Sequence, residues 1–268
     1  MMEYLKVSEN LNVLTVSLNR PTKRNAFFPP MIAEITKVFG KASNDKNLRA
    51  VLLTGERPSF CAGGDAEWMR SMTDFTQKQN VADSENLFDM YSAIRNCPVP
   101  VIGGVFGHCF GGGAGLVAVC DIVAAENATE FCFSEVKLGL VPAVISPFVM
   151  ERANQSKVTE WFITGQVFGT EEAMLGGLIH FRGTAHEADV FLEENFKLIL
   201  NAAPEAVRET KKLLRSYSTT NWKKVRTQVT KLIADRRVSE EGQRGLKAFL
   251  EKRNPRWSEP PNGRPAKI

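Results

Sequence analysis

The first half of the chain alternates between two hydrophobic periods. Residues 11–18 (LNVLTVSL) alternate apolar and polar side chains, as a strand with one buried face does. Residues 50–54 (AVLLT) form a short apolar run, which is typical of a parallel sheet covered on both faces. Apolar residues recur at helical spacing in 31–39 and again in 87–94. This alternation predicts an α/β fold whose strands are joined by right-handed crossovers.

The second half of the chain shows mainly the helical period. Helices are expected over 145–151, 157–164, 170–176, 188–202, 204–217, 221–237 and 239–253. In one of them Trp222, Val225, Val229 and Ile233 mark a single apolar face, and Asn221 is a plausible N-cap. The proline-rich tail, 254–268, is expected to be irregular. We therefore expect a core over 1–200 and a helical region over 201–268.

Two glycine-containing loops are the most informative feature. Apolar residues 101–106 lead into Gly111-Gly112-Gly113, and the uncharged stretch 114–120 follows, which predicts a buried strand, a sharp turn and a buried helix. The loop 59–65 (SFCAGGD) similarly follows the 50–54 strand. Glycine lets the backbone approach a ligand closely, and a helix start offers unpaired N–H groups. If both loops lie beyond the carboxyl ends of their strands, their amides can form an oxyanion hole.

Several other classes of site are excluded. No Gly-Lys-Ser/Thr follows the glycines, and the third glycine of a dinucleotide fingerprint would fall on Leu116. The five cysteines show no zinc or redox spacing, so they are interpreted as buried, reduced thiols. No apolar run approaches the roughly 20 residues of a membrane helix. The N-terminus lacks the apolar core of a signal peptide, so a cytoplasmic location is expected.

The formal net charge of +4 comes mainly from basic pairs late in the chain. These pairs are Lys211-Lys212, Lys223-Lys224, Arg236-Arg237 and Lys252-Arg253. Acidic residues are interleaved and no stacking aromatics alternate with the basic ones, which disfavours nucleic acid as a partner. A solvated helix face is the simplest explanation of the charge, and a surface that attracts a phosphorylated small ligand is the intermediate alternative.

Several motifs in a fixed order resemble one family. They are Leu18-Asn19-Arg20-Pro21, Arg24-Asn25-Ala26, residues 60–65 (FCAGGD), 107–113, 120–122 (CDI), 134–142 (SEVKLGLVP), Thr164-Gly165 and 248–253 (AFLEKR). In these residues the chain is similar to the crotonase (enoyl-CoA hydratase/isomerase) superfamily along nearly its whole length. The resemblance implies a crotonase-like spiral of ββα units with a C-terminal helical trimerisation region.

The resemblance also implies roles for particular residues. The two oxyanion-hole amides fall on Gly64 and Gly112, where they would hold the acyl-CoA thioester oxygen as it becomes an enolate. Substrate and CoA contacts fall on Arg24, Asn25, Ala26, Ala62, Asp65 and, from a neighbouring subunit, Lys252. Lys252 is equally well explained as a solvated helix lysine. The family forms trimers, often paired into hexamers, and needs no metal or cofactor beyond the CoA of its substrate.

One acid/base residue departs from the family pattern. Typical hydratases carry two glutamates beside the substrate; the second matches Glu135, whereas the first falls on Gly115. Glu135 alone could transfer the proton if its pKa suits the task. His108 is a candidate second acid/base, although a histidine packed in the loop is the stronger interpretation. The acyl pocket is expected to include Trp68, Met69, His108 and Phe148.

Residues 143–149 (AVISPFV) also depart from the family's usual glycine-rich segment. Together with residues 63–69 and 113–116, they look like the bacterial methylglutaconyl-CoA hydratase-like members of leucine and isoprenoid catabolism. The first hypothesis is therefore hydration or dehydration of a short, branched or carboxylated 2-enoyl-CoA. An enoyl-CoA isomerase with a single glutamate base, a decarboxylase, and a non-catalytic acyl-CoA- or RNA-binding protein are the alternatives.

Overall fold

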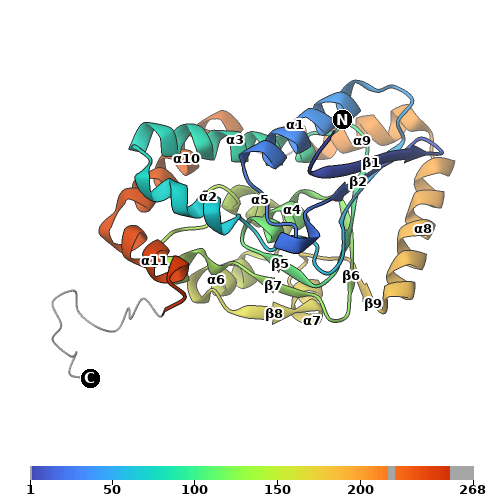
Figure 1. Cartoon of the computed structure of the whole chain (residues 1–268). Helices are drawn as coiled ribbons and strands as arrows, with labels where there is room; N and C mark the ends of the chain where they lie inside the picture. The colour runs from blue at the N-terminus through green and yellow to red at the C-terminus, as the bar shows by residue number, and fades with distance from the viewer. Residues whose placement is uncertain (1, 217–220, 254–268) are drawn as a thin grey trace.

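Two sheets and the helices around them make up the fold (Figure 1). The computed structural model describes residues 2–216 and 221–253; the tail expected to be irregular, 254–268, lies outside the described residues. The larger sheet has six strands in the order β1-β2-β3-β4-β6-β9. They are β1 (Leu5–Asn10), β2 (Val13–Leu18), β3 (Ala50–Gly55), β4 (Val101–Val105), β6 (Ile122–Glu126) and β9 (Phe181–Gly183). Only β1 and β2 pair antiparallel within it, so the expected α/β fold is confirmed.

Two expected strands have different bounds in the structure. The strand expected over 11–18 begins at Val13, because Leu11 and Asn12 have φ angles of 49° and 61° and form the turn after β1. The apolar run after Val101 divides into β4 and β5 (His108–Phe110), which belong to different sheets. Gly107 allows the division: its φ is +60°, and a Cβ there would lie 2.4 Å from the carbonyl oxygen of Pro58.

The smaller sheet carries the chain from the glycine turn to the next functional segment. It contains β5, β7 (Glu130–Cys132) and β8 (Val167–Gly169), with β7 in the middle. The helix α4 (Gly112–Val119) starts two residues after β5, and the 3-10 helix η3 (Ser134–Leu138) starts two residues after β7. Because β5 and β7 run parallel, the starts of α4 and η3 lie at the same edge of this sheet.

The helices expected in the second half are confirmed, with small changes at their ends. They are α5 (Ser146–Arg152), α6 (Gln155–Thr164), α7 (Thr170–Leu175), α8 (Ala185–Asn201), α9 (Pro204–Ser216), α10 (Trp222–Val238) and α11 (Glu240–Leu250). The first half contributes η1 (Pro21–Lys23), α1 (Pro29–Asn44), α2 (Ala66–Ser71), η2 (Met72–Asp74) and α3 (Gln77–Arg95). In Figure 1, α10 lies along α3 and α11 lies close to α2, so the last two helices cover the region around α2.

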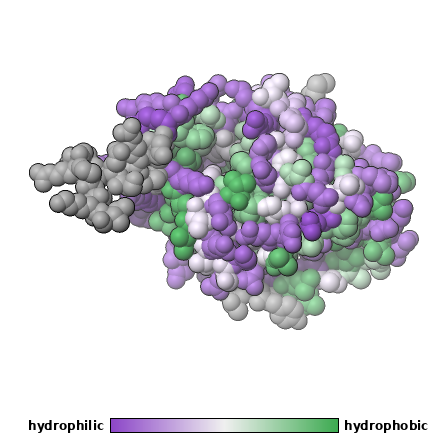
Figure 2. Space-filling view, turned by 90° about the horizontal axis from the view of Figure 1, so that it is seen from below, coloured by the Kyte–Doolittle hydropathy of each residue, from purple (hydrophilic) through white to green (hydrophobic). Residues whose placement is uncertain are grey.

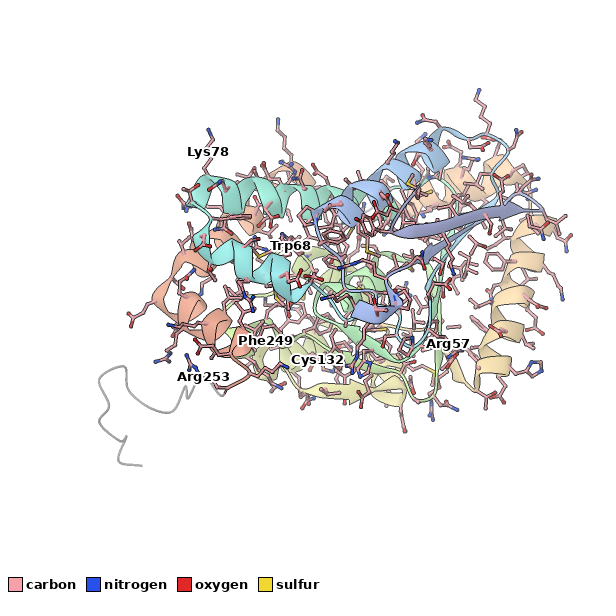
Figure 3. The ribbon with its side chains drawn as sticks, in the orientation of Figure 1. Arg57, Trp68, Lys78, Cys132, Phe249 and Arg253 are labelled. Carbon is pink, nitrogen blue, oxygen red and sulfur yellow. The ribbon has the colours of Figure 1, made fainter. Side chains whose placement is uncertain are left out.

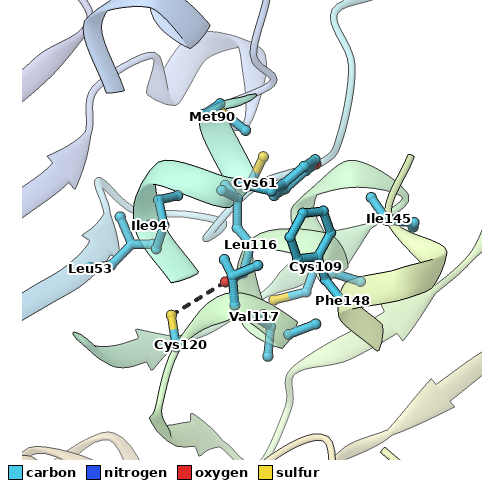
Figure 4. Packing of buried hydrophobic residues seen from close by; sticks show 14 of the residues in the cluster. Leu53, Cys61, Met90, Ile94, Cys109, Leu116, Val117, Cys120, Ile145 and Phe148 are labelled. Atoms are coloured by element: carbon cyan, nitrogen blue, oxygen red, sulfur yellow. Dashed lines mark hydrogen bonds between the residues drawn. The ribbon is translucent and has the colours of Figure 1, made fainter. Parts of the chain in front are cut away.

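The main core lies between the larger sheet and the helices α1, α3, α4 and α5. Figure 4 shows part of it around Leu116 and Val117, with Cys120 Sγ donating to the carbonyl oxygen of Leu116. All five cysteines are buried, and burial raises the pKa of Cys61 to about 12, so these thiols are neutral. The face shown in Figure 2 is mainly hydrophilic, with separate apolar patches. Among the described residues, no helix has both the length and the hydrophobicity of a membrane span.

Candidate active site

The two glycine loops lie side by side and are joined by main-chain hydrogen bonds. Cys61 and Cys109 form an isolated parallel bridge: the Cys61 N–H donates to His108 O at 3.0 Å, and the Phe110 N–H donates to Cys61 O at 3.1 Å. A Cβ at Gly113 would lie 2.2 Å from the same Cys61 oxygen, so only glycine permits this approach. The loop after β3 is therefore fixed against the turn that starts α4.

This packing leaves the amides of Gly64 and Gly112 without a main-chain partner. Phe27 bridges Gly64 by donating to Gly63 O and accepting from the Asp65 N–H, each at 2.9 Å. The Gly64 N–H takes no part in that bridge, and the Gly112 N–H is the first of helix α4. Among the described residues neither amide has a backbone acceptor. A Cβ at Gly63 would lie 3.8 Å from Gly112 N, which shows how close the loops are.

A cavity of about 290 Å³ opens beside these glycines. Its wall comes from both loops, from α2, and from the later helices α10 and α11. Figure 3 labels Trp68 on α2 and Phe249 on α11, which contribute to the wall. Apart from Ser134, Glu135 and Arg237, the described side chains lining the cavity are apolar. The site is therefore a largely apolar pocket with few polar groups, as small-molecule sites are.

Glu135 is the one carboxylate among the described lining residues. It sits in η3, directly after β7, and the Gly111 N–H donates to Cys132 O at 2.7 Å across this junction. Its Oε1 would lie 3.4 Å from a Cβ at Gly111, so the carboxylate lies over the turn, while its Oε2 is sealed from solvent without a hydrogen-bond partner. Burial raises the pKa of Glu135 to about 7, which suits a group that both accepts and returns a proton.

Nearly the whole chain matches one known protein family. A profile described as enoyl-CoA hydratase/isomerase matches residues 8–260. The chain belongs to the enoyl-CoA hydratase/isomerase family. It is 29% identical over 258 residues to the enoyl-CoA hydratase AKT6-1 of Alternaria alternata, covering 95% of this chain and 84% of the relative.

A second relative carries a different activity in its name, and a solved structure carries the first one again. A mitochondrial Delta(3,5)-Delta(2,4)-dienoyl-CoA isomerase of Pongo abelii is 34% identical over 223 residues, covering 78% of this chain and 67% of that protein. The crystal structure of an enoyl-CoA hydratase from Shewanella pealeana superposes with a TM-score of 0.79 at 35% identity, covering 96% of each chain. The protein is therefore an enzyme of the enoyl-CoA hydratase/isomerase family, whose substrates are CoA thioesters.

Three residues expected to contact CoA form a tight turn beside the first loop. Arg24 is exposed, with a φ of 49°, and its carbonyl oxygen accepts from the Ala62 N–H at 3.0 Å. Asn25 is fully buried, and its Nδ2 donates to Glu56 O and Ser59 O at 2.7 Å each. Ala26 is buried as well. None of these three residues lines the cavity, whereas Ala62, which is bonded to their turn, does.

Asp65 and Lys252, which were also expected to contact substrate or CoA, lie outside the cavity wall. Asp65 is buried as the N-cap of α2: its Oδ1 accepts from the Glu67 N–H at 2.8 Å, and its Oδ2 pairs with Arg20 at 3.0 Å. Its carboxylate is thereby committed to holding the loop in place. Lys252 is exposed just after α11, with a φ of 53°. Within this chain it makes no contact with the cavity.

Two of the four residues expected in the acyl pocket line the cavity. Trp68 and Met69 line the cavity, but His108 and Phe148 do not. The His108 ring lies with its Nδ1 3.0 Å from Ser59 Oγ and faces Glu130, and it packs edge-on against Phe110, which separates it from the cavity that Phe110 lines. Phe148 is buried against Tyr91 and Trp222 instead. The packed-loop interpretation of His108 therefore fits the structure better than a catalytic one.

Other side chains fill the space next to Gly115, where the family's first glutamate would stand. A Cβ at Gly115 would lie 2.6 Å from Ile145 Cγ2 and 3.1 Å from the Tyr91 hydroxyl oxygen. Tyr91 and Ile145 thus fill the space that a side chain at 115 would enter.

Among residues 2–216 and 221–253, no group of His, Cys, Asp or Glu side chains is placed to hold a metal ion.

The sequence did not single out two residues at this site. Tyr91 donates its hydroxyl to Gly112 O at 2.8 Å and so supports the first turn of α4. Arg237 was counted with the solvated basic pairs, yet it is 6% exposed and lines the cavity. A signal for Arg237 existed: it stands four residues after Ile233, and therefore on the apolar face predicted for that helix.

Proposed function

We propose that this enzyme catalyses the reversible addition of water to a short-chain 2-enoyl-CoA, with Glu135 as its single acid/base. The amides of Gly64 and Gly112 would hold the thioester oxygen as negative charge develops on it. Glu135 would accept a proton from water as the hydroxyl adds to C3, and return that proton to C2. The observation that carries the proposal is the unpartnered Oε2 of Glu135 beside the two free amides.

Isomerisation is the second candidate, and one observation favours it specifically. Among the described residues the cavity wall has a single carboxylate, and Tyr91 and Ile145 fill the space next to Gly115 that a second one would need. Moving a double bond from the 3- to the 2-position needs only one base that removes a proton from C2 and delivers it to C4. Glu135 over the Gly111 turn satisfies that requirement without a second acid.

The test offers purified protein crotonyl-CoA, 3-methylglutaconyl-CoA and a 3-enoyl-CoA. We expect hydration of at least one of the first two, with Glu135→Gln reducing kcat/KM by about 100- to 10,000-fold. The matched control, Glu67→Gln, changes a carboxylate that is 78% exposed and lies outside the cavity, and it should keep the wild-type rate. Migration of the 3-enoyl double bond without any hydration would replace the first proposal by the second. Activity that survives Glu135→Gln would contradict both.

The finer aspects of the family resemblance are proposals as well. We propose a methylglutaconyl-CoA-like substrate in branched amino acid catabolism, a cytoplasmic location, and assembly into a trimer or a hexamer of paired trimers. The exposed Leu198 on α8 and Leu213 and Leu214 on α9 support the assembly, because a subunit interface would cover them. Lys252, exposed and away from its own cavity, is available to reach CoA bound to a neighbouring subunit.

A further inference from the structure

Among the described residues, the cavity wall holds one charged side chain besides Glu135, the guanidinium of Arg237. It projects from the last turn of α10 and is 6% exposed. Its neighbours along the wall, such as Ile233, Leu246 and Trp68, are apolar or aromatic. A guanidinium in such surroundings is costly unless its donors find acceptors, so the partners of each nitrogen decide what the residue does.

One nitrogen of Arg237 is fully used by helix α3. Nη1 donates to Asp83 Oδ2 at 2.9 Å, to Ser84 Oγ at 3.2 Å and to Asn80 Oδ1 at 3.4 Å. The other oxygen of Asp83 accepts from Trp68 Nε1 at 3.0 Å. The guanidinium is therefore held in position by α3, and Asp83 also ties it to a second residue of the cavity wall.

The opposite edge of the guanidinium is unused. Nε is buried without a hydrogen-bond partner, and within the described residues Nη2 makes no hydrogen bond. Nε and Nη2 form the fork that fits the two oxygens of a carboxylate. A purely hydrocarbon acyl chain would leave both donors unsatisfied, whereas a carboxylate at the end of the chain would satisfy them.

We infer that Arg237 is a specificity residue that binds a carboxylate at the distal end of the acyl chain. The substrate is then the CoA monothioester of a short unsaturated dicarboxylic acid, with its thioester at Gly64 and Gly112 and its free carboxylate at Arg237. The inference rests on the proposed function for the position of the thioester. Asp83 remains the structural counterion, so the incoming carboxylate adds to a guanidinium that is already fixed.

The test measures binding of two saturated thioesters, glutaryl-CoA and pentanoyl-CoA, which have equal chain lengths and need no turnover. Calorimetry should show that wild-type protein binds glutaryl-CoA at least about tenfold more tightly. Arg237→Met should remove most of this preference, since hydrogen bonds to charged groups are worth about 10- to 100-fold in affinity. Arg226→Met is the matched control: Arg226 also joins α10 to α3, through Asp89 and Glu85, but lies outside the cavity wall.

Because Arg237→Met also leaves Asp83 without its counterion, a second variant separates that effect from the loss of carboxylate binding. Arg237→Lys keeps a positive charge near Asp83 but lacks the fork, so it should also reduce the preference for glutaryl-CoA. Equal affinity of wild-type protein for the two thioesters, or a preference that survives both Arg237 variants, would overturn the inference. If crotonyl-CoA is hydrated while the two thioesters bind equally, the proposed function stands without it. If the preference depends on Arg237 but the protein transforms no enoyl-CoA, carboxylate binding at Arg237 stands and the proposed function is refuted.

Discussion

At the scale of single residues, the burial that raises the pKa of Glu135 toward the range useful for proton transfer also destabilises the folded protein. Its Oε2 is sealed in an apolar wall without a hydrogen bond, and this burial raises the pKa to about 7. A carboxyl group whose folded pKa lies above its unfolded value stabilises the fold only while it is protonated. That contribution is complete below pH 4.5 and is lost as the pH rises through about 7. The ionised form, which the proposed reaction uses, is therefore the less stable one.

This conflict predicts that Glu135→Gln stabilises the protein while inactivating it. At pH 8 the variant should gain up to about 3 kcal/mol in free energy of unfolding, because a neutral amide replaces a buried charge. At pH 4.5 the gain should vanish. Urea denaturation of the wild type and the variant at both pH values measures the difference, with Glu67→Gln as the exposed control. An equal difference at pH 4.5 and pH 8 would show that Glu135 is not buried in its charged form.

At the scale of elements, α9 is fixed to the core by charge as well as by apolar contact. Lys211 is buried, donates to Val99 O at 3.0 Å and forms an ion pair with Asp121. Arg215, one turn later, pairs with Asp121 at 3.2 Å and with Glu151 at 3.3 Å. These residues face a second cavity, of about 590 Å³, which lies away from the glycine turn. The network therefore joins α9 to the segment before β4, to the residue before β6 and to α5, and it lies outside the cavity beside the glycine turn.

Removing the buried cation should loosen that attachment. We expect Lys211→Met to lower the free energy of unfolding by about 1–3 kcal/mol, because Val99 O loses its donor and Asp121 keeps only Arg215 and the Val101 N–H as partners. The neighbouring Lys212 is 75% exposed, and Lys212→Met should stay within about 0.5 kcal/mol of the wild type. Thermal or urea unfolding of both variants decides the matter; similar losses for the two would mean that burial of Lys211 carries no stability.

At the scale of the whole molecule, the sequence predicted what depends on periodicity and missed what depends on contacts between distant segments. The α/β alternation and the later helices follow from local pattern, and they agree with the structure. The three-residue strands β8 and β9 are too short to leave a period of two. Lys211 and Arg237 were interpreted as part of a solvated face, because their acidic partners, Asp121 and Asp83, lie 90 and 154 residues earlier.

The candidate site shows the same division. The glycine loops and Glu135 were found from motifs that each lie within one short segment, whereas the cavity wall draws on segments from Phe27 to Phe249. His108 lies against Ser59 of the loop after β3, and Phe148 packs against Tyr91 of α3, so neither side chain lines the cavity. Neither orientation could be derived from sequence spacing, since both are fixed by residues on other elements.

The proposed assembly gives a prediction at this scale. Light scattering on the purified protein should give a mass of three or six times 29.8 kDa, because the exposed leucines of α8 and α9 are then covered by neighbouring chains. Dilution to low micromolar concentration should leave that mass unchanged. A mass of one chain across this range would refute the assembly and, with it, the supply of Lys252 to a neighbouring site.

Cys61 gives the molecule a built-in reporter. Its thiol is fully buried beneath the Gly63–Gly64 turn, with its Sγ donating to Gly63 O at 3.9 Å, and its backbone is bonded to β5. An alkylating reagent reaches this sulfur only in molecules whose turn has separated from β5. The labelling rate at Cys61 therefore reports how often the loop that carries Gly63 and Gly64 separates from β5, and a bound thioester that holds this loop closed would slow the labelling.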